Sequence, residues 1–408
     1  MKHKQDTTMH VTVVGGGFGG VKAALEIAKH KRARVTLISD KLDFQYYPAL
    51  YSTATGGSYR QSWIPLGEIF ADYENVEIII DTVTTIDRQA KTIGTSTGVT
   101  HQYQTLILAL GSVTTYFGIP GLDQYTYGVK SLEEITHLKQ HLLRSFSKAH
   151  GADSHFLIIG AGPTGVELAS ALGSYLQYLK KKYGHPQPHP TISIIEAAPR
   201  VMPRMSEKAS ATIEKRLKKL GVHVETNKKV EEATADSLIV NGRAIQSHTV
   251  VWTSGVANSP FFKANESQFT LAPNGRVVVD GHLRVDPHVY VIGDNAITAF
   301  GGLAQTAVRD GQYVAKQILR QSTKKLNAKV VPVVIPVGKH WALFEYKWLR
   351  ISGVLGSLIR EAADFVGYKD ILPFNKAYIA WRTQTESQED TWLAEYNTDK
   401  DSEKAKSL

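Results

Sequence analysis

The sequence contains the same glycine-rich turn twice, and no other feature constrains its fold as strongly. The first copy reads VTVVGGGFGGVKAAL and the second reads FLIIGAGPTGVEL. In each copy an apolar run typical of a strand leads into glycines spaced G-x-G-x-x-G, and a stretch typical of a helix follows. A strand, this spacing and a helix together predict a dinucleotide-binding unit. The glycines are Gly15, Gly17 and Gly20 in the first copy and Gly160, Gly162 and Gly165 in the second.

Each glycine of such a turn has a separate physical role. The first permits a tight turn out of the strand, the second lets the backbone approach a pyrophosphate, and the third lets the helix pack against the strand. The helix N-terminus then directs its unpaired N–H groups toward the phosphates. Two ordinary strand-to-helix turns are the alternative, and the apolar run before each turn disfavours it.

The repeat extends beyond the turns themselves. LILALGS, ending at Gly111-Ser112, follows the first turn, and VVWTSGV, containing Gly255, follows the second. The separation of Gly111 from Gly255 is within one residue of the separation of Gly15 from Gly160. We therefore predict an α/β protein with two Rossmann-like dinucleotide-binding domains of similar length.

The composition excludes several kinds of chemistry. The 408 residues include no cysteine, which excludes disulfides, thiolate catalysis and cysteine-ligated iron–sulfur clusters. No apolar run is long enough for a spanning helix, and the first residues have no apolar core of a secretory signal. The histidines, His155 among them, have no metal-ligand spacing, and no nucleic-acid module is visible, so we expect neither ligand. The net charge of +9 suits a negatively charged surface and equally a soluble basic protein.

A polar residue follows the second strand of each unit, where an acidic side chain normally holds the adenosine ribose. In the first unit RVTLISD ends at Ser39 and Asp40, and Asp40 is either a ribose ligand or a solvated turn residue. In the second unit TISIIEA ends at Glu196. A carboxylate there accepts from a 2′-hydroxyl and repels a 2′-phosphate, which favours NADH over NADPH. Arg200 and Arg204 lie nearby and weaken this preference.

A third turn follows both units. RVDPHVYVIGDNA ends an apolar strand at Gly293-Asp294, and a helix is expected to begin near Leu303 or Ala304. Two nucleotide turns and a GD turn in this order resemble flavoprotein reductases with two dinucleotide-binding domains. That resemblance implies FAD in the first unit, NAD(P)H in the second, insertion of the second unit into the first, and contact between Asp294 and the flavin ribityl chain.

The resemblance also implies domain limits and ligand contacts. The FAD domain is expected at residues 1–120 and 281–337 and the NADH domain at residues 121–280. The residues expected to contact one of the two cofactors are Gly15, Gly17, Gly20, Ser39, Asp40, Ala109, Gly111, Asp294 and Ala304 for FAD, and Gly160, Gly162, Gly165, Glu196 and Gly255 for NADH.

The absence of cysteine excludes several groups of flavoprotein reductases with two dinucleotide-binding domains. Lipoamide, glutathione and sulfide:quinone reductases and NADH peroxidases all need reactive cysteines. The remaining motifs resemble type II NADH:quinone oxidoreductases over nearly the whole chain: DFQYYPALYSTATGG with Tyr51, YQTLILALGS, GAGPTGVELA with Glu167, EAAPRVMPRM and WTSGV. AQTAVRDG stands where that family has two glutamines; Gln305 matches the first and Arg309 replaces the second.

This family resemblance implies a reaction and its residues. Two electrons pass from NADH through FAD to a membrane quinone, without proton pumping, as in a respiratory chain. Glu167 is expected to position the nicotinamide or to help protonate quinone, with a surface carboxylate at a helix start as the alternative. Gln305 is expected to face the flavin or the quinone carbonyl. Gln305, Arg309 and Tyr51 are the residues expected at the quinone.

The C-terminal part, residues 338–383, is expected to bind a membrane surface. Apolar residues recur there at helical spacing, with Arg360, Glu361 and Asp364 on the opposite face. Three of the six tryptophans and several basic residues accompany them, a pattern typical of an interfacial helix. Core packing or a dimer contact is the alternative. The apolar positions are Ile351, Val354, Leu355, Leu358, Ile359, Ala362, Phe365 and Val366.

The sequence therefore predicts a peripheral flavoprotein on the cytoplasmic side of the cell membrane, a homodimer, with a polar tail at residues 384–408. Two other functions stay open. One is a soluble flavin reductase that passes electrons to a small iron–sulfur protein. The other is a flavin- and NADH-binding redox sensor that recruits a protein partner.

Overall fold

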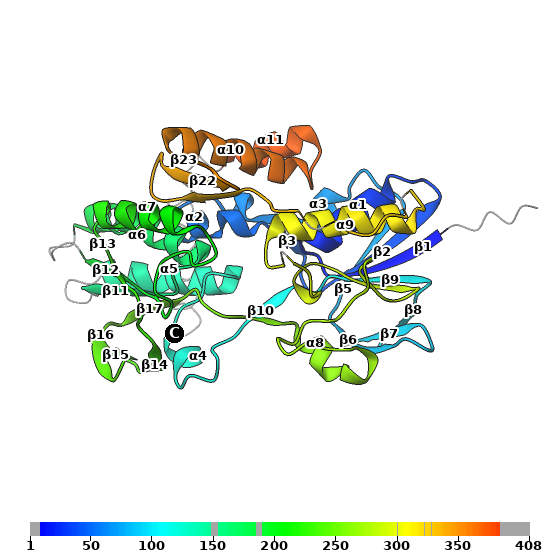
Figure 1. The fold of residues 1–408 in the computed structure, drawn as a ribbon, viewed down its shortest axis with the longest axis horizontal. Coiled ribbons are helices and arrows are strands. Elements are labelled where there is room, and N and C mark those ends of the chain that lie inside the picture. The colour runs from blue at the N-terminus through cyan, green and yellow to red at the C-terminus, as the bar shows by residue number, and fades with distance from the viewer. Residues whose placement is uncertain are drawn as a thin grey trace, which may run out of the picture.

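The computed structural model describes residues 9–147, 154–184, 190–299, 301–321, 323–327 and 329–383. Two α/β lobes lie side by side, and a smaller element lies across the top of both (Figure 1). The first glycine turn is in the lobe at the right of the figure and the second is in the lobe at the left. The polar tail predicted at 384–408 lies outside the described residues.

The first lobe is built on a six-stranded sheet with the order β19-β20-β9-β1-β2-β5. All neighbouring pairs are parallel except β19–β20. The strands are β1 (Met9–Val14), β2 (Ala33–Ser39), β5 (Val76–Ile80), β9 (Thr105–Leu108), β19 (Arg284–Asp286) and β20 (Val289–Val291). Smaller elements around the sheet are β3 (Asp43–Gln45), α2 (Leu50–Ala54), β4 (Trp63–Pro65), α3 (Leu66–Ile69), β6 (Val83–Asp87), β7 (Thr92–Thr95) and β8 (Thr100–Gln102).

Two helices of this lobe, α1 (Phe18–Ala28) and α9 (Ala304–Ile318), pack unusually closely. A Cβ atom on Gly311 would lie 2.4 Å from the carbonyl oxygen of Gly19, so a side chain at position 311 would push the helices apart. Because α1 follows the first glycine turn and α9 follows the GD turn, this contact brings the two turns together although they are far apart in the sequence.

The second lobe contains a four-stranded parallel sheet with the order β13-β12-β11-β17. Its core contains side chains of β11, α5, α6 and α7, and a three-stranded meander lies against other residues of the sheet. The elements are α4 (Leu122–Tyr125), α5 (Leu132–Ser147), β11 (His155–Ile159), α6 (Pro163–Tyr183), β12 (Thr191–Ile195), α7 (Glu207–Lys219), β13 (Val222–Glu225), the meander strands β14 (Val230–Ala233), β15 (Ser237–Val240) and β16 (Arg243–Gln246), and β17 (Thr249–Trp252).

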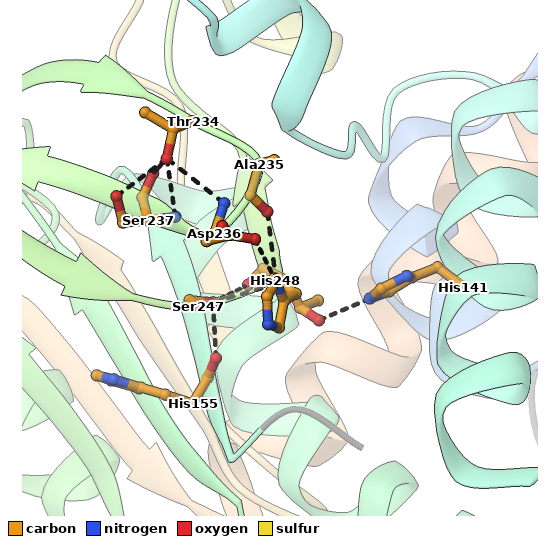
Figure 2. Close-up of polar contacts among 9 residues, drawn as sticks. His141, His155, Thr234, Ala235, Asp236, Ser237, Ser247 and His248 are labelled. Carbon is orange, nitrogen blue, oxygen red and sulfur yellow. Dashed lines mark hydrogen bonds and ion pairs between the residues drawn. The ribbon is translucent and has the colours of Figure 1, made fainter. Parts of the chain in front are cut away.

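Three histidines, His141, His155 and His248, lie where the meander and α5 meet the sheet, as Figure 2 shows. His155 accepts a hydrogen bond at its backbone oxygen from Ser247 Oγ at 2.7 Å, and its ring Nε2 lies 2.8 Å from Ser193 Oγ of β12. His248 Nδ1 lies 3.3 Å from the oxygen of Ala235, and His141 Nε2 lies 2.7 Å from Thr249 Oγ1. These histidines therefore have structural partners. Within the described ranges no group of three or more histidine, aspartate or glutamate side chains is arranged to hold a metal ion.

The chain passes between the lobes through one antiparallel ribbon, formed by β10 (Ser112–Thr114) and β18 (Val256–Asn258). After β18 the chain returns to the first lobe. Phe261, Phe262 and Phe269, in and after α8 (Pro260–Ala264), pack into a core that contains residues of β1, β2 and β9. The limit expected at residue 280 therefore falls inside the first lobe, and the structure locates the crossing at this ribbon. The fold class is confirmed, with one α/β unit inserted into another.

The C-terminal element begins with a three-stranded antiparallel sheet, β21 (Val333–Pro336), β22 (Ala342–Tyr346) and β23 (Leu349–Gly353). Two helices follow, α10 (Val354–Lys369) and α11 (Phe374–Arg382). The helical pattern read from Ile351 was therefore wrong at its start, because Ile351 lies in β23. Among the residues that the structure describes, no helix has the length and apolar character needed to cross a bilayer.

Candidate nucleotide and acceptor sites

The first glycine turn has a geometry that only glycine tolerates. Gly15 has φ +112°, and a Cβ atom there would lie 2.2 Å from the oxygen of Ala109. A Cβ atom on Gly20 would lie 2.0 Å from the oxygen of Gly15, so the helix approaches the turn closely. By contrast, nothing lies within 4 Å of a Cβ atom built on Gly17. Gly17 therefore faces open space at the N-terminus of α1, where a pyrophosphate would approach the backbone.

The second turn repeats this geometry in the other lobe. Gly160 has φ +104°, with its Cβ position 2.0 Å from Ser254 Oγ. The Cβ position of Gly165 lies 1.9 Å from the oxygen of Gly160, and that of Gly162 meets nothing within 4 Å. In both turns the first and third glycines are crowded and the second faces open space, as a dinucleotide-binding turn requires. Binding at these glycines stays a prediction.

The residues at the strand tips differ between the lobes. Ser39 is buried, and its hydroxyl donates to the oxygen of Lys41 at 2.8 Å and accepts from the N–H of Lys41 at 3.2 Å. Asp40 is exposed beside it. In the second lobe Glu196 accepts from the N–H of Ala161 at 2.6 Å and from the N–H of Ala198 at 2.8 Å. Glu196 therefore lies against the second glycine turn, within reach of a ligand there.

The GD turn meets the strand end that carries Gly111. Asn295 Nδ2 donates to the oxygen of Gly111 at 2.6 Å, and Asn295 Oδ1 accepts from its N–H at 3.0 Å. Ser112 Oγ donates to Asp294 Oδ2 at 3.1 Å. The structure thus brings Asp294 and Gly111 together, and Ala109 lies against Gly15, as described above.

Asp310 supports the GD turn from α9 and was not identified from the sequence. Its carboxylate accepts from the N–H of Gly293 at 3.2 Å and is almost completely buried. The pKa of Asp310 is raised to about 6, mainly by burial and also by the neighbouring carboxylate of Asp294, while the Gly293 hydrogen bond and Arg309 act to lower it. The only sequence feature that could have indicated this role is the position of Asp310 among the residues of α9 that are buried.

The helix α9 begins at Ala304, as predicted, and Gln305 is exposed in its first turn. Arg309 lies one turn later, and its Nη1 donates to the oxygen of Lys329 at 3.2 Å. Arg309 is thus bonded to the segment that leads to β21. Gly255 lies at the crossing ribbon with φ +71°, where its oxygen accepts from Lys130 Nζ at 3.0 Å.

Glu167 lies in a buried ionic cluster that joins three parts of the molecule. Arg360 Nη1 lies 3.2 Å from Glu167 Oε1, Arg360 Nε lies 2.7 Å from Asp364 Oδ2, and Arg360 Nη2 donates to the oxygen of Pro48 at 2.8 Å. The side chains of Glu167 and Arg360 are 10% and 11% exposed. The cluster therefore links α6 of the second lobe, the loop before α2 of the first lobe, and α10.

Burial dominates the acidity of this cluster. It raises the pKa of Glu167 to about 7, against Arg360, which lowers it, while Asp364 raises it. Burial also raises the pKa of Tyr51, whose ring belongs to α2 and which feels the charges of Arg360 and Glu167. A carboxyl group with a pKa near neutrality is suited to give and take a proton at physiological pH.

An aromatic stack extends the cluster into the first lobe. Tyr46 Oη donates to Asp364 Oδ1 at 3.3 Å, and its ring stacks on that of Tyr368 with centroids 4.2 Å apart. Tyr368 is fully buried and donates to the oxygen of Gln61 at 2.6 Å. Arg360 and Asp364 were placed on the polar face of the helix, but that this face points inward is visible only in the structure.

The face of α10 that carries Arg360 and Asp364 is therefore buried although it is ionic, and Tyr368 of the same helix reaches the core of the first lobe. Its ionic residues Arg360 and Asp364 face inward, and apolar residues of α10 and α11 face solvent. Trp348, at the tip of the β22–β23 hairpin, is 82% exposed, whereas Trp381 donates to the oxygen of Glu361 at 2.9 Å. We call this exposed surface the apolar outer face; it consists of Trp348, Leu349, Val354, Leu355, Leu358, Val366, Phe374, Tyr378 and Ile379.

Comparison with known proteins agrees with this geometry. The model of the pyridine nucleotide-disulphide oxidoreductase family matches residues 9–311. The type II NADH:quinone oxidoreductase Ndh of Mycobacterium tuberculosis is 31% identical over 76% of this chain and 72% of that protein. The type II NADH:quinone oxidoreductase of Staphylococcus aureus is 27% identical over 87% of this chain and 94% of that protein.

Among solved structures, NDH2 from Plasmodium falciparum in complex with NADH superposes with a TM-score of 0.81 at 18% identity, over 92% of this chain and 97% of that chain. At this identity the likeness concerns the fold. The redox disulphide in the family's name has no counterpart here, because the chain has no cysteine. The resemblance stated from the sequence is confirmed: the chain belongs to the pyridine nucleotide-disulphide oxidoreductase family and, within it, to the type II NADH:quinone oxidoreductases.

Proposed function

We propose that this flavoprotein oxidoreductase oxidises NADH and passes two electrons through FAD to a quinone at a membrane surface, without pumping protons. The observation that carries the proposal is the pair of glycine turns with open space at Gly17 and Gly162, one in each of two lobes. The names of the related proteins support NADH as donor and quinone as acceptor. The cofactors supply hydride and electron transfer when bound, and the chain supplies position and proton exchange.

We propose domain limits at the ribbon of β10 and β18, and its antiparallel pairing supports them. The FAD domain comprises the first lobe, including residues after β18, and the NADH domain comprises the inserted lobe between β10 and β18. Asp294 and Gly111 meet at one edge of the first lobe, which supports their place at the flavin. Glu196 at the tip of β12 supports NADH over NADPH, because a carboxylate repels a 2′-phosphate.

We assign Glu167 the exchange of a proton with the acceptor. Reduction of a quinone to a quinol consumes two electrons and two protons, and NADH delivers both electrons but only one proton. The carboxyl group of Glu167 is buried, has a pKa of about 7, and is held by Arg360 near Tyr51. Tyr51, Gln305 and Arg309 remain the residues proposed to line the quinone site. The exposure of Gln305 leaves its amide accessible there.

We assign the apolar outer face to a membrane surface. Apolar side chains on two adjacent helices, with Lys347 and Lys369 exposed around them, suit the interface of an anionic bilayer. Binding on the cytoplasmic side and a homodimeric state are further parts of the proposal. Orientation is tested by protease protection in right-side-out and inverted vesicles, and the oligomer by sedimentation at several protein concentrations.

The decisive experiment is steady-state NADH oxidation with a short-chain quinone, with ferricyanide and with oxygen as alternative acceptors. We expect rapid turnover with quinone, and no acidification when the enzyme works in sealed vesicles loaded with a pH-sensitive dye. Turnover with ferricyanide but not with any quinone would favour the soluble reductase, which needs a small iron–sulfur protein as acceptor. Tight NADH binding with slow turnover toward every acceptor would favour the redox sensor.

A further inference from the structure

Arg360 is the point at which the C-terminal element enters the interior of the molecule. Its guanidinium group contacts Glu167 of the second lobe and the oxygen of Pro48 in the first lobe, and also pairs with Asp364 on its own helix. A fourth contact, from Nη1 to the oxygen of Val334 at 3.4 Å, fixes it against β21. One cation therefore lies between both nucleotide lobes and α10.

A purely mechanical clamp would not need buried ionic groups. Taking charges out of water is costly, and a buried ion pair often stabilises a protein no better than apolar residues of the same size. Glu167 also lies two residues after Gly165, in the first turns of the helix that begins at the nucleotide turn. Its ionisation is therefore felt close to the place where NADH is expected to bind.

We propose that Arg360 is a positioning residue that controls the protonation of Glu167, so that the seated C-terminal element is part of the proton path to the electron acceptor. The role of the proton path rests on the proposed function, whereas the control of Glu167 by Arg360 does not. The proposal makes the C-terminal element a component of the chemistry as well as a surface for binding a membrane.

The charged groups around Glu167 determine whether its pKa is raised or lowered. Arg360 and Asp364 face it from α10, and Tyr51 faces it from α2. Burial alone would hold the proton of Glu167 too tightly for a working acid, and Arg360 lowers the pKa while Asp364 raises it. Arg360 thereby brings the carboxyl group into the range in which it loses and regains a proton during each turnover.

The proton step balances without another reagent. The Oε–H bond of Glu167 breaks, its bonding electrons stay on the carboxylate, and a new O–H bond forms on the negatively charged oxygen of a quinone that the two electrons from NADH have reduced. The carboxylate is stabilised by Arg360 until water supplies the next proton. Because Glu167 acts as an acid, the rate of quinone reduction falls as pH rises through its pKa.

Two substitutions should move the pH at which the rate of quinone reduction falls, and they should move it in opposite directions. Arg360→Met removes the cation, raises the pKa of Glu167 and moves the falling limb to higher pH by about one unit or more. Asp364→Asn removes the anion that competes for Arg360. The pKa of Glu167 should therefore fall, and the falling limb should move to lower pH. The readout is the pH profile of kcat with a soluble quinone, taken relative to ferricyanide, which accepts electrons without protons.

A merely structural role would give a different result. Loss of packing would lower the plateau in both variants without moving their limbs apart. Arg360→Lys should restore the limb toward that of the parent enzyme, because it keeps the charge. Glu361→Gln, an exposed carboxylate on the same helix, is the matched control and should leave the profile unchanged. Flavin content and a cooperative melt are checked first for each variant, and Asp364→Asn still tests the proposal if Arg360→Met does not fold.

A second readout separates this proposal from the proposed function. Infrared difference spectra against Glu167→Gln report the carbonyl stretch of the protonated carboxyl group without any turnover. Opposite shifts of that titration in Arg360→Met and Asp364→Asn support the control of Glu167, even if no quinone is reduced and the proposed function fails. Shifts in the same direction, or no shift in either variant, overturn it.

Discussion

The carboxylate of Glu196 lies 2.6 Å from the backbone nitrogen of Ala161, so the acidic tip of β12 is bonded to the glycine turn of the neighbouring strand. The same side chain also accepts from the N–H of Ala198. A ribose that bonds to Glu196 would therefore meet a carboxylate that is already fixed in place, with little rotamer freedom left to lose on binding.

Replacing Glu196 by alanine should weaken NADH binding by about 1 to 3 kcal/mol, because charge-assisted hydrogen bonds to the ribose are lost. NADPH binding should be weakened less than NADH binding, so that kcat/KM for NADH divided by kcat/KM for NADPH falls. Glu232→Gln, an exposed carboxylate on β14, is the control. An unchanged ratio in Glu196→Ala would locate the selectivity at another residue.

Substitutions at two glycines of the first turn should affect ligand binding and folding separately. A Cβ atom at position 17 would meet nothing within 4 Å, so Gly17→Val should fold but lose FAD, because its side chain occupies the space of the pyrophosphate. Gly20→Val meets the oxygen of Gly15 and should lower the melting temperature directly. Flavin-to-protein ratio and thermal melts measure the two effects. Full flavin occupancy in folded Gly17→Val would contradict the site.

The apolar outer face should bind vesicles without affecting the NADH chemistry. Leu355→Glu with Leu358→Glu should abolish flotation with anionic vesicles and lower the rate with a membrane-dissolved quinone, because charge opposes burial in the bilayer interface. Val99→Glu serves as control, because it replaces an exposed apolar residue between β7 and β8, strands that lie at the opposite side of Figure 1 from α10 and α11. Undiminished flotation of the folded double variant would make this face a contact with another protein.

Truncation near Val337, before the helices of the C-terminal element, would be a poor test of membrane binding. The C-terminal element contributes Tyr368, Ile371, Leu372 and Ala377 to the core of the first lobe. Removing it would expose that core and leave Glu167 without Arg360. We expect the truncated chain to lose cooperative unfolding, which surface substitutions avoid.

Asp310 should make stability depend on pH with a defined sign. Its pKa is about 6 in the folded protein, above the 3.8 of an unperturbed aspartate. The folded state therefore binds the proton more tightly, and stability falls as pH rises from about 4 to about 6, by roughly 3 kcal/mol at most. Asp310→Asn should remove this loss and be more stable than the parent at pH 7.

Chemical denaturation at pH 4.5 and at pH 7 measures the effect of Asp310, with the exposed Asp72→Asn as control. The difference between Asp310→Asn and the parent should be small at the lower pH and large at the higher one. Equal differences at both pH values would show that the carboxyl group does not titrate in this range. Flavin retention across the same pH range would report whether the GD turn depends on the charge.

Local rules were sufficient for much of the fold. The two glycine turns and the start of α9 at Ala304 were predicted because each depends on backbone geometry within a few residues. The pairing of Glu167 with Arg360 spans 193 residues, and no local pattern carries it. Ile351 was assigned to the helix because it lies three residues before Val354, at helical spacing, and over so short a stretch the strand and helix periods cannot be distinguished.

The domain limit at residue 280 failed for a related reason. Phe261 and Phe262 follow the second unit without any turn signal that marks a return to the first, and only the core they join shows where they belong. Asp310 was overlooked because a carboxylate in a helix is usually solvated. Its burial goes with its place against the GD turn, where it accepts from the N–H of Gly293, a residue distant from it in the local sequence pattern.

The ribbon of β10 and β18 also bears on how such a molecule arises. Thr114 and Val256, at the two ends of the inserted lobe, are paired neighbours in that ribbon. A segment whose entry and exit are adjacent can be added to a host domain without separating the host's own strands. The same adjacency makes the inserted lobe a unit for exchange, provided that a homologous lobe keeps the buried contact that Glu167 makes with Arg360.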